Sequence, residues 1–208
     1  MCIRDGTRVD GGGGAALRIL MFEPDAGGHR LTYLRQLLPA LEGLGEVTVV
    51  VGEGAIATEA FRVQLGALRE THRFESVAFD KPPSRLGKAR ARLDALRSAM
   101  DLCDPEHIYI PSGDGLAQLM GLPGSRTRLA LKPGVQIEVG MHRGSFAYPA
   151  RGAKDGLTRS LALRALTRAP IVRAQFVDVL AYEWLRDRGP PLAKRASGLA
   201  DPVDPSPI

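Results

Sequence analysis

Apolar residues in this chain form short runs that alternate with stretches of helical spacing. The first run, residues 17–22, is too short for a helix and has the length of a strand buried on both faces. The sequence Glu-Pro-Asp-Ala then breaks the pattern, and Gly27 and Gly28 follow it. From Leu31 onward the apolar residues recur at helical spacing. This stretch therefore predicts a strand, a glycine turn and a helix.

The same alternation continues along the rest of the chain. Runs rich in β-branched and aromatic residues predict further strands, and amphipathic stretches predict the helices between them. The predicted strands are residues 46–51, 73–79, 107–111 and 171–176, and residues 128–131 and 135–139 are expected to form two further strands or parts of one. The predicted helices are residues 55–70, 85–102, 116–120, 153–167 and 179–188. Ser84 is expected to cap the helix at 85–102, and Asp178 the helix at 179–188.

Alternating strands and helices are typical of a mainly parallel sheet with right-handed crossovers. We therefore expect an α/β fold, a Rossmann-like three-layer α/β/α domain over residues 17–198. Residues 1–16, with four consecutive glycines, are expected to form a disordered tail. Residues 199–208 carry proline at every second or third position and read as a linker.

Composition and net charge exclude few classes of binding partner. A net charge of +5 could serve a nucleic acid, an anionic membrane surface or an anionic substrate. Five Arg or Lys residues lie in the helix expected at 85–102, where a solvated outer face is the favoured interpretation. We expect no nucleic-acid partner, while a peripheral membrane contact stays open.

Cysteine usage and the lack of a targeting segment bear on the cellular compartment. Cys2 and Cys103 are far apart in the sequence, which indicates free thiols. No signal peptide or membrane span is visible, so a cytoplasmic protein is expected.

The glycine turn after the first strand is the first candidate site. Ligands of open parallel sheets bind beyond the carboxyl ends of the strands, and Gly27 and Gly28 would let a ligand approach the backbone. His29 could act as a general base at neutral pH, or it could merely cap the helix. Glu23 and Asp25 could orient His29 or bind a hydroxyl, or they could simply favour the turn.

Two later loops supply a second set of polar residues. Ser112 and Asp114 follow the strand at 107–111, and Ser145 follows the strand at 135–139; all three could bind sugar-like hydroxyls. His142 and Arg143 form a further pair, in which Arg143 could bind a phosphate or carboxylate through two hydrogen bonds. The four histidines are scattered, so no metal site is predicted. Neither the dinucleotide fingerprint, the phosphate-binding P-loop nor the GxSxG nucleophile motif occurs.

Three segments resemble glycosyltransferases with two Rossmann-like domains (GT-B), of the family 4-like type. The opening FEPDAGGHRLTYLRQLLPAL is followed by the strand EVTVV. The segment GMHRGSFAYP stands where such enzymes place an acceptor-side loop, and the ending GLADPVDPSPI resembles their domain junction. The resemblance implies that this chain is the amino-terminal, acceptor-side half of a GT-B architecture.

The resemblance also implies roles for the candidate residues. His29 would be the base and His142 the second choice, and Gly27 and Gly28 would approach the donor phosphates or sugar. The residues expected to bind the acceptor are Glu23, Asp25, Ser112, Asp114, Arg143 and Ser145. The partners would be a nucleotide-sugar co-substrate, a glycan or lipid-linked acceptor and a second Rossmann-like domain in cis or in trans; no other cofactor is expected. Because the chain stops at Ile208, where that domain would begin, we expect no sugar transfer by this chain alone.

Two other functions fit the same pattern. The chain could be a binding or regulatory module that keeps the fold without chemistry. It could also be a self-sufficient α/β enzyme of the epimerase or phosphate-transfer kind, which would require a charged catalytic cluster. Fold alone does not separate these possibilities, because this architecture hosts many chemistries.

Overall fold

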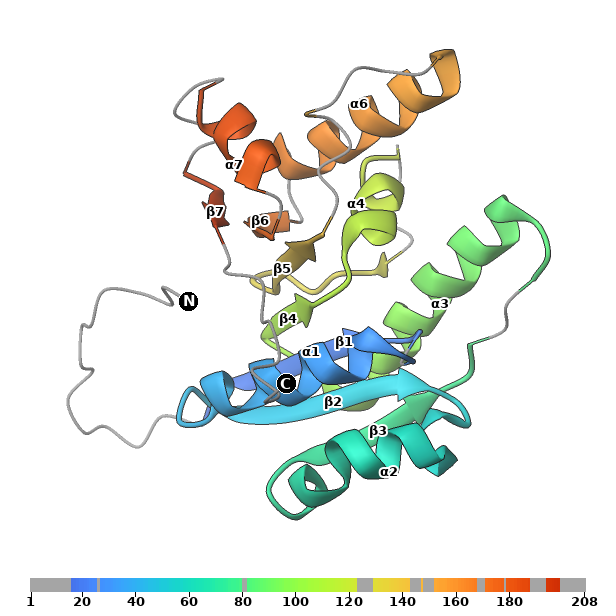
Figure 1. Cartoon of the computed structure of the whole chain (residues 1–208), viewed down its shortest axis with the longest axis vertical. Coiled ribbons are helices and arrows are strands. Elements are labelled where there is room, and N and C mark those ends of the chain that lie inside the picture. The colour runs from blue at the N-terminus through green and yellow to red at the C-terminus, as the bar shows by residue number, and fades with distance from the viewer. Residues whose placement is uncertain are drawn as a thin grey trace, which may run out of the picture.

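A computed structural model describes residues 16–25, 27–79, 82–122, 129–142, 147, 152–167, 171–177, 179–187 and 194–198. These residues contain a seven-stranded sheet in the order β3-β2-β1-β4-β5-β6-β7, and every strand pair is parallel (Figure 1). The strands are β1 (Arg18–Glu23), β2 (Glu46–Gly52), β3 (Arg73–Val77), β4 (His107–Ile110), β5 (Gln136–Met141), β6 (Ile171–Phe176) and β7 (Ala196–Gly198).

Helices connect successive strands, as parallel pairing requires. The α-helices are α1 (His29–Leu37), α2 (Glu59–Leu65), α3 (Arg85–Cys103), α4 (Asp114–Met120), α6 (Ala153–Thr167) and α7 (Val179–Arg186). Short 3₁₀-helices extend or precede two of them: η1 (Leu38–Leu41), η2 (Ala55–Ala57) and η3 (Gly66–Glu70). Among the described helices, none is both long enough and apolar enough to cross a membrane.

The sheet separates two hydrophobic clusters. On one face, α1, η1 and α2 pack over β1 and β2, with Leu34, Val49 and Phe61 fully or almost fully buried. On the other face, α3, α4, α6 and α7 pack over the sheet from β3 to β6, around residues such as Phe22 and Ile110. Side chains alternate between the two faces along each strand, and β1 contributes to both clusters. The predicted α/β/α architecture is confirmed.

Most predicted elements are present, with differences at their ends. The helix expected at 55–70 is divided into η2, α2 and η3, because Thr58 caps a new helix by accepting a hydrogen bond from the Phe61 amide at 3.2 Å. The strand expected at 128–131 is wrong for its described part: Leu129 is helical and buried, and Ala130 has a φ of 47°, which no strand contains. The three-residue strand β7 was not predicted.

The expected domain limits stay a prediction. Of the amino-terminal tail only Ala16 is described, and the linker expected at 199–208 lies outside the described residues. Asp178, the expected helix cap, lies outside them as well. Cys103 is a free thiol, as expected.

Gly121 tests the packing of α4 against α6. It ends α4 with a φ of −72°, which any residue can adopt, but a Cβ there would lie 1.9 Å from the backbone oxygen of Leu161. We expect Gly121→Ala to lower the free energy of unfolding by about 2 kcal/mol or more, because α6 must move away. Gly156 lies inside α6, where an added Cβ would meet open space. Gly156→Ala should therefore raise the free energy of unfolding by about 0.5–1 kcal/mol. Urea denaturation of both variants measures the contrast; similar stabilities would contradict it.

Candidate functional site

The strand order reverses between β1 and β4. From β1 the chain continues through α1 to β2 on one side, whereas from β4 it continues through α4 to β5 on the other side. The two connections also cross opposite faces of the sheet, since α1 and α4 belong to different hydrophobic clusters. The loops that follow β1 and β4 therefore diverge, which opens a crevice at the carboxyl edge of the sheet, the usual ligand-binding position in such folds.

A cavity of about 400 Å³ lies at this position. It is built from the ends of β1, β4 and β5 together with the first turns of α1 and α4 and one residue of α3. Six of the residues predicted from the sequence line it, namely Glu23, Asp25, His29, Ser112, Asp114 and His142. Sequence analysis missed Arg30 and Arg92, which line it too.

The other predicted site residues do not line the cavity or are not described. Gly27 and Gly28 form the turn that opens α1, and Gly28 has a φ of 56°, a conformation that favours glycine. The amide of Arg30 donates to the Gly27 carbonyl at 3.3 Å, so the turn fixes where α1 begins. Arg143 and Ser145 lie outside the described residues.

Two carboxylates and two guanidinium groups occupy the β1 side of the cavity. Arg30 lies 3.3 Å from Glu23 Oε1 and 3.1 Å from Asp25 Oδ2. Arg92, from α3, lies 2.7 Å from the same Oδ2 atom. The expected orientation of His29 by these carboxylates stays a prediction. The expectation that the basic residues of 85–102 form a solvated face is wrong for Arg92.

Glu23 is the most deeply buried charged group of the site, with 2% of the residue exposed. Burial raises the pKa of Glu23, and this effect outweighs the opposing hydrogen bond from Ser112 and the positive charge of Arg30. Within the part of the chain that the structure describes, its Oε2 atom has no hydrogen-bond partner. Buried acceptors are normally satisfied, so this buried, unsatisfied oxygen marks Glu23 as a candidate functional group of the site.

Three contacts fix His142. Its backbone N–H donates to Asp114 Oδ2 at 3.0 Å, and its ring Nε2 lies 3.0 Å from the Pro111 carbonyl oxygen. Because a carbonyl only accepts, Nε2 must carry the proton, and in the neutral ring Nδ1 is then the basic nitrogen. The Tyr33 ring packs edge-on against the imidazole with centroids 4.6 Å apart, and His29 lies 6.2 Å from the same tyrosine ring.

Comparisons with known proteins agree with the fold. No protein family model matches the chain, and no curated protein matches its sequence. The crystal structure of Glycyrrhiza uralensis UGT73P12 complexed with glycyrrhetinic acid 3-O-monoglucuronide is similar, with a TM-score of 0.56 and 10% sequence identity. The similarity covers 90% of this chain and 49% of that one, a plant enzyme of GT-B fold. The chain therefore has the fold of one half of a GT-B architecture, with no preference shown for family 4.

The buried carboxyl of Glu23 predicts a pH-dependent stability. Its folded-state pKa is above the usual value of about 4.3, so its contribution to stability is present at lower pH and is lost as pH rises through the raised pKa. Glu23→Gln removes the ionisation and retains the shape. We expect the stability of this variant relative to wild type to increase steadily from pH 4 to pH 7, measured by urea denaturation.

The matched control is Glu59→Gln on the surface of α2. Arg62 lowers the pKa of Glu59, so the sign is opposite and this variant should lose stability relative to wild type as pH rises. The prediction is contradicted if the stability of Glu23→Gln relative to wild type stays constant with pH or falls as it does for Glu59→Gln. Either result would show that Glu23 ionises in the folded protein without a cost in stability.

Proposed function

We propose that this chain is the acceptor-side domain of a glycosyltransferase, which transfers a sugar from a nucleotide-sugar donor to an acceptor hydroxyl. The observation that carries the proposal is the convergence of Glu23, Asp114 and His142, from three different strand ends, on one cavity at the point where the strand order reverses. A buried carboxyl group with an unsatisfied acceptor atom suits a hydroxyl donor, and a histidine with a fixed tautomer suits proton removal.

In the proposed reaction the acceptor oxygen attacks the anomeric carbon of the donor sugar. The bond from that carbon to the nucleotide diphosphate breaks, and the diphosphate leaves with the bonding electrons. The hydroxyl proton passes to a base, for which we propose Nδ1 of His142, with His29 as the second candidate. Glu23 Oε2 and Asp114 would orient the acceptor, while Arg30 and Arg92 hold the carboxylates of the β1 side in place.

We further propose that a second Rossmann-like domain, in the same polypeptide or in a partner, binds the nucleotide and stabilises the charge on the leaving diphosphate. The similar solved structure is about twice as long as its matched part, which supports a two-domain enzyme. It is also complexed with a monoglucuronide, which supports an acceptor that bears hydroxyl groups. Gly27 and Gly28 would then face the donor across the cleft between the domains.

Sugar transfer by this chain, joined to or mixed with a donor-binding domain, tests the proposal with a panel of nucleotide sugars and acceptors. We expect His142→Ala to lower kcat by about 10²-fold or more, because the base is lost, while the acceptor KM changes little. His29→Ala should have the smaller effect.

His72→Gln is the matched control, because His72 lies beside β3 and lines no part of the cavity. Its kcat should equal that of wild type. Unchanged turnover in both His29→Ala and His142→Ala would remove both histidines from the role of base. Acceptor binding by calorimetry with no transfer for any donor would favour a binding or regulatory module instead.

A further inference from the structure

A second cavity lies on the α1 face of the sheet, over β4, β5 and β6. Strands in the middle of a parallel sheet are usually apolar on both faces. On this face, however, β4 presents His107 and Tyr109, β5 presents Glu138 and β6 presents Gln175. Three of these four residues are more than 90% buried. Polar residues that violate a local folding rule in this way are often found at functional sites.

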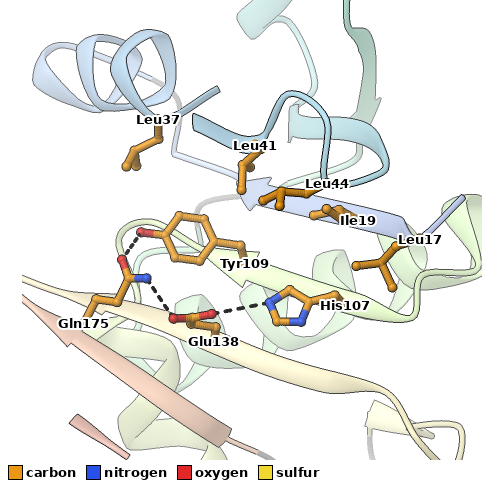
Figure 2. Close-up of a pocket in the computed structure, with 9 residues that line it drawn as sticks. All are labelled: Leu17, Ile19, Leu37, Leu41, Leu44, His107, Tyr109, Glu138 and Gln175. Atoms are coloured by element: carbon orange, nitrogen blue, oxygen red, sulfur yellow. Dashed lines mark hydrogen bonds and ion pairs between the residues drawn. The ribbon is translucent and has the colours of Figure 1, made fainter. Parts of the chain in front are cut away.

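The four side chains form one hydrogen-bonded row across three strands (Figure 2). The Tyr109 hydroxyl donates to Gln175 Oε1 at 3.0 Å, and Gln175 Nε2 donates to Glu138 Oε1 at 2.7 Å. Glu138 Oε2 lies 3.5 Å from His107 Nε2. A carboxylate has about four acceptor positions, so Glu138 can accept a further donor.

The walls of this cavity are apolar. They consist of Leu17, Ile19, Leu37, Leu41 and Leu44, which come from β1 and the residue before it, from the end of α1 and from the segment that follows α1. The cavity volume is about 140 Å³. An engineered protein cavity of about 150 Å³ with similar walls holds one benzene molecule, so this space fits one six-membered ring.

The charge at the polar end favours a cation. Burial acts to raise the pKa of Glu138, but hydrogen bonds from His107 and Gln175 and the positive charge of Arg173 together lower it, so the group is an ionised carboxylate at neutral pH. Arg173 lines the neighbouring groove at the amino-terminal edge of the sheet and does not line this cavity. A buried anion at the end of an apolar space attracts a ligand that carries one positive hydrogen-bond donor.

We propose that this cavity binds a small primary amine with a single-ring apolar body, its ammonium group directed at Glu138. The ring would contact the leucines under α1, and the ammonium would donate to the free acceptor positions of the carboxylate. This cavity shares no lining residue with the cavity at the carboxyl edge, so the proposal stands independently of glycosyl transfer.

Titration of the full chain with three probes at pH 7 tests the proposal: benzylamine, benzyl alcohol and toluene, followed by NMR of labelled leucine methyl groups. We expect benzylamine to shift the methyl signals of Leu37, Leu41 and Leu44, and to bind about tenfold more tightly than benzyl alcohol because its hydrogen bond is charged. Equal affinities of the two probes, or shifts confined to other methyl groups, would overturn the proposal.

Variants separate the charge from the shape of the cavity. Glu138→Gln should reduce benzylamine affinity to the level of benzyl alcohol, whereas Glu75→Gln, on the edge strand β3, should leave it unchanged. Leu44→Phe fills the partly buried rim and should abolish binding of all three probes. Retained benzylamine binding in Glu138→Gln would overturn the proposal; if that variant does not fold, the wild-type comparison of the three probes with the Leu44→Phe result decides it.

Discussion

The pairing of β1 with β4 is the constraint on which both cavities depend. Three Cα pairs, Ile19 with His107, Leu20 with Ile108 and Met21 with Tyr109, join strands that are almost 90 residues apart in the sequence. At the carboxyl ends of these strands the chain diverges and leaves the crevice that holds Glu23 and Asp114. On the α1 face of the same pair, nearer the amino-terminal edge, Ile19, His107 and Tyr109 line the second cavity. A shift of this register by one residue would move each β4 side chain to the other face and dismantle both.

The charges at the end of β1 are arranged to hold that edge in one geometry. Glu23 and Asp25 have two guanidinium partners, Arg30 from α1 and Arg92 from α3, so helices on opposite faces of the sheet are tied to the same loop. Such partly buried pairs add little net stability, because desolvation offsets their attraction, but the loss of one partner leaves a buried charge uncompensated. The network therefore restricts the position of the loop more than it stabilises the fold, which is what a preorganised site requires.

Local patterns were sufficient to predict β1, β2, β6 and α6, because apolar runs, helical spacing and glycine stops are properties of neighbouring residues. They were also sufficient to predict that Glu23, Ser112 and His142 belong to the site, since each lies at the end of a strand and parallel strands share one carboxyl edge. Arg92 could not be found in this way: it lies 67 residues from Asp25, in a helix whose basic residues resemble any solvated face. Strand β7 was missed because three residues, Ala-Ser-Gly, carry no strand preference and pair only because β6 offers a free edge.

The polar row of His107, Tyr109, Glu138 and Gln175 requires a reason beyond the fold. The same face of β1 and β2 carries the apolar residues Met21, Val49 and Val51, which belong to one hydrophobic cluster with residues of α1 and α2. Apolar residues at 138 and 175 would continue that packing and would avoid the desolvation of a carboxylate, which hydrogen bonds and nearby positive charge must otherwise offset. The opposite face of β5 shows that apolar residues fit these strands, since Ile137 and Val139 are fully buried there. Packing alone therefore does not require the row, and a ligand with a positively charged donor would give the carboxylate a further partner besides His107 and Gln175.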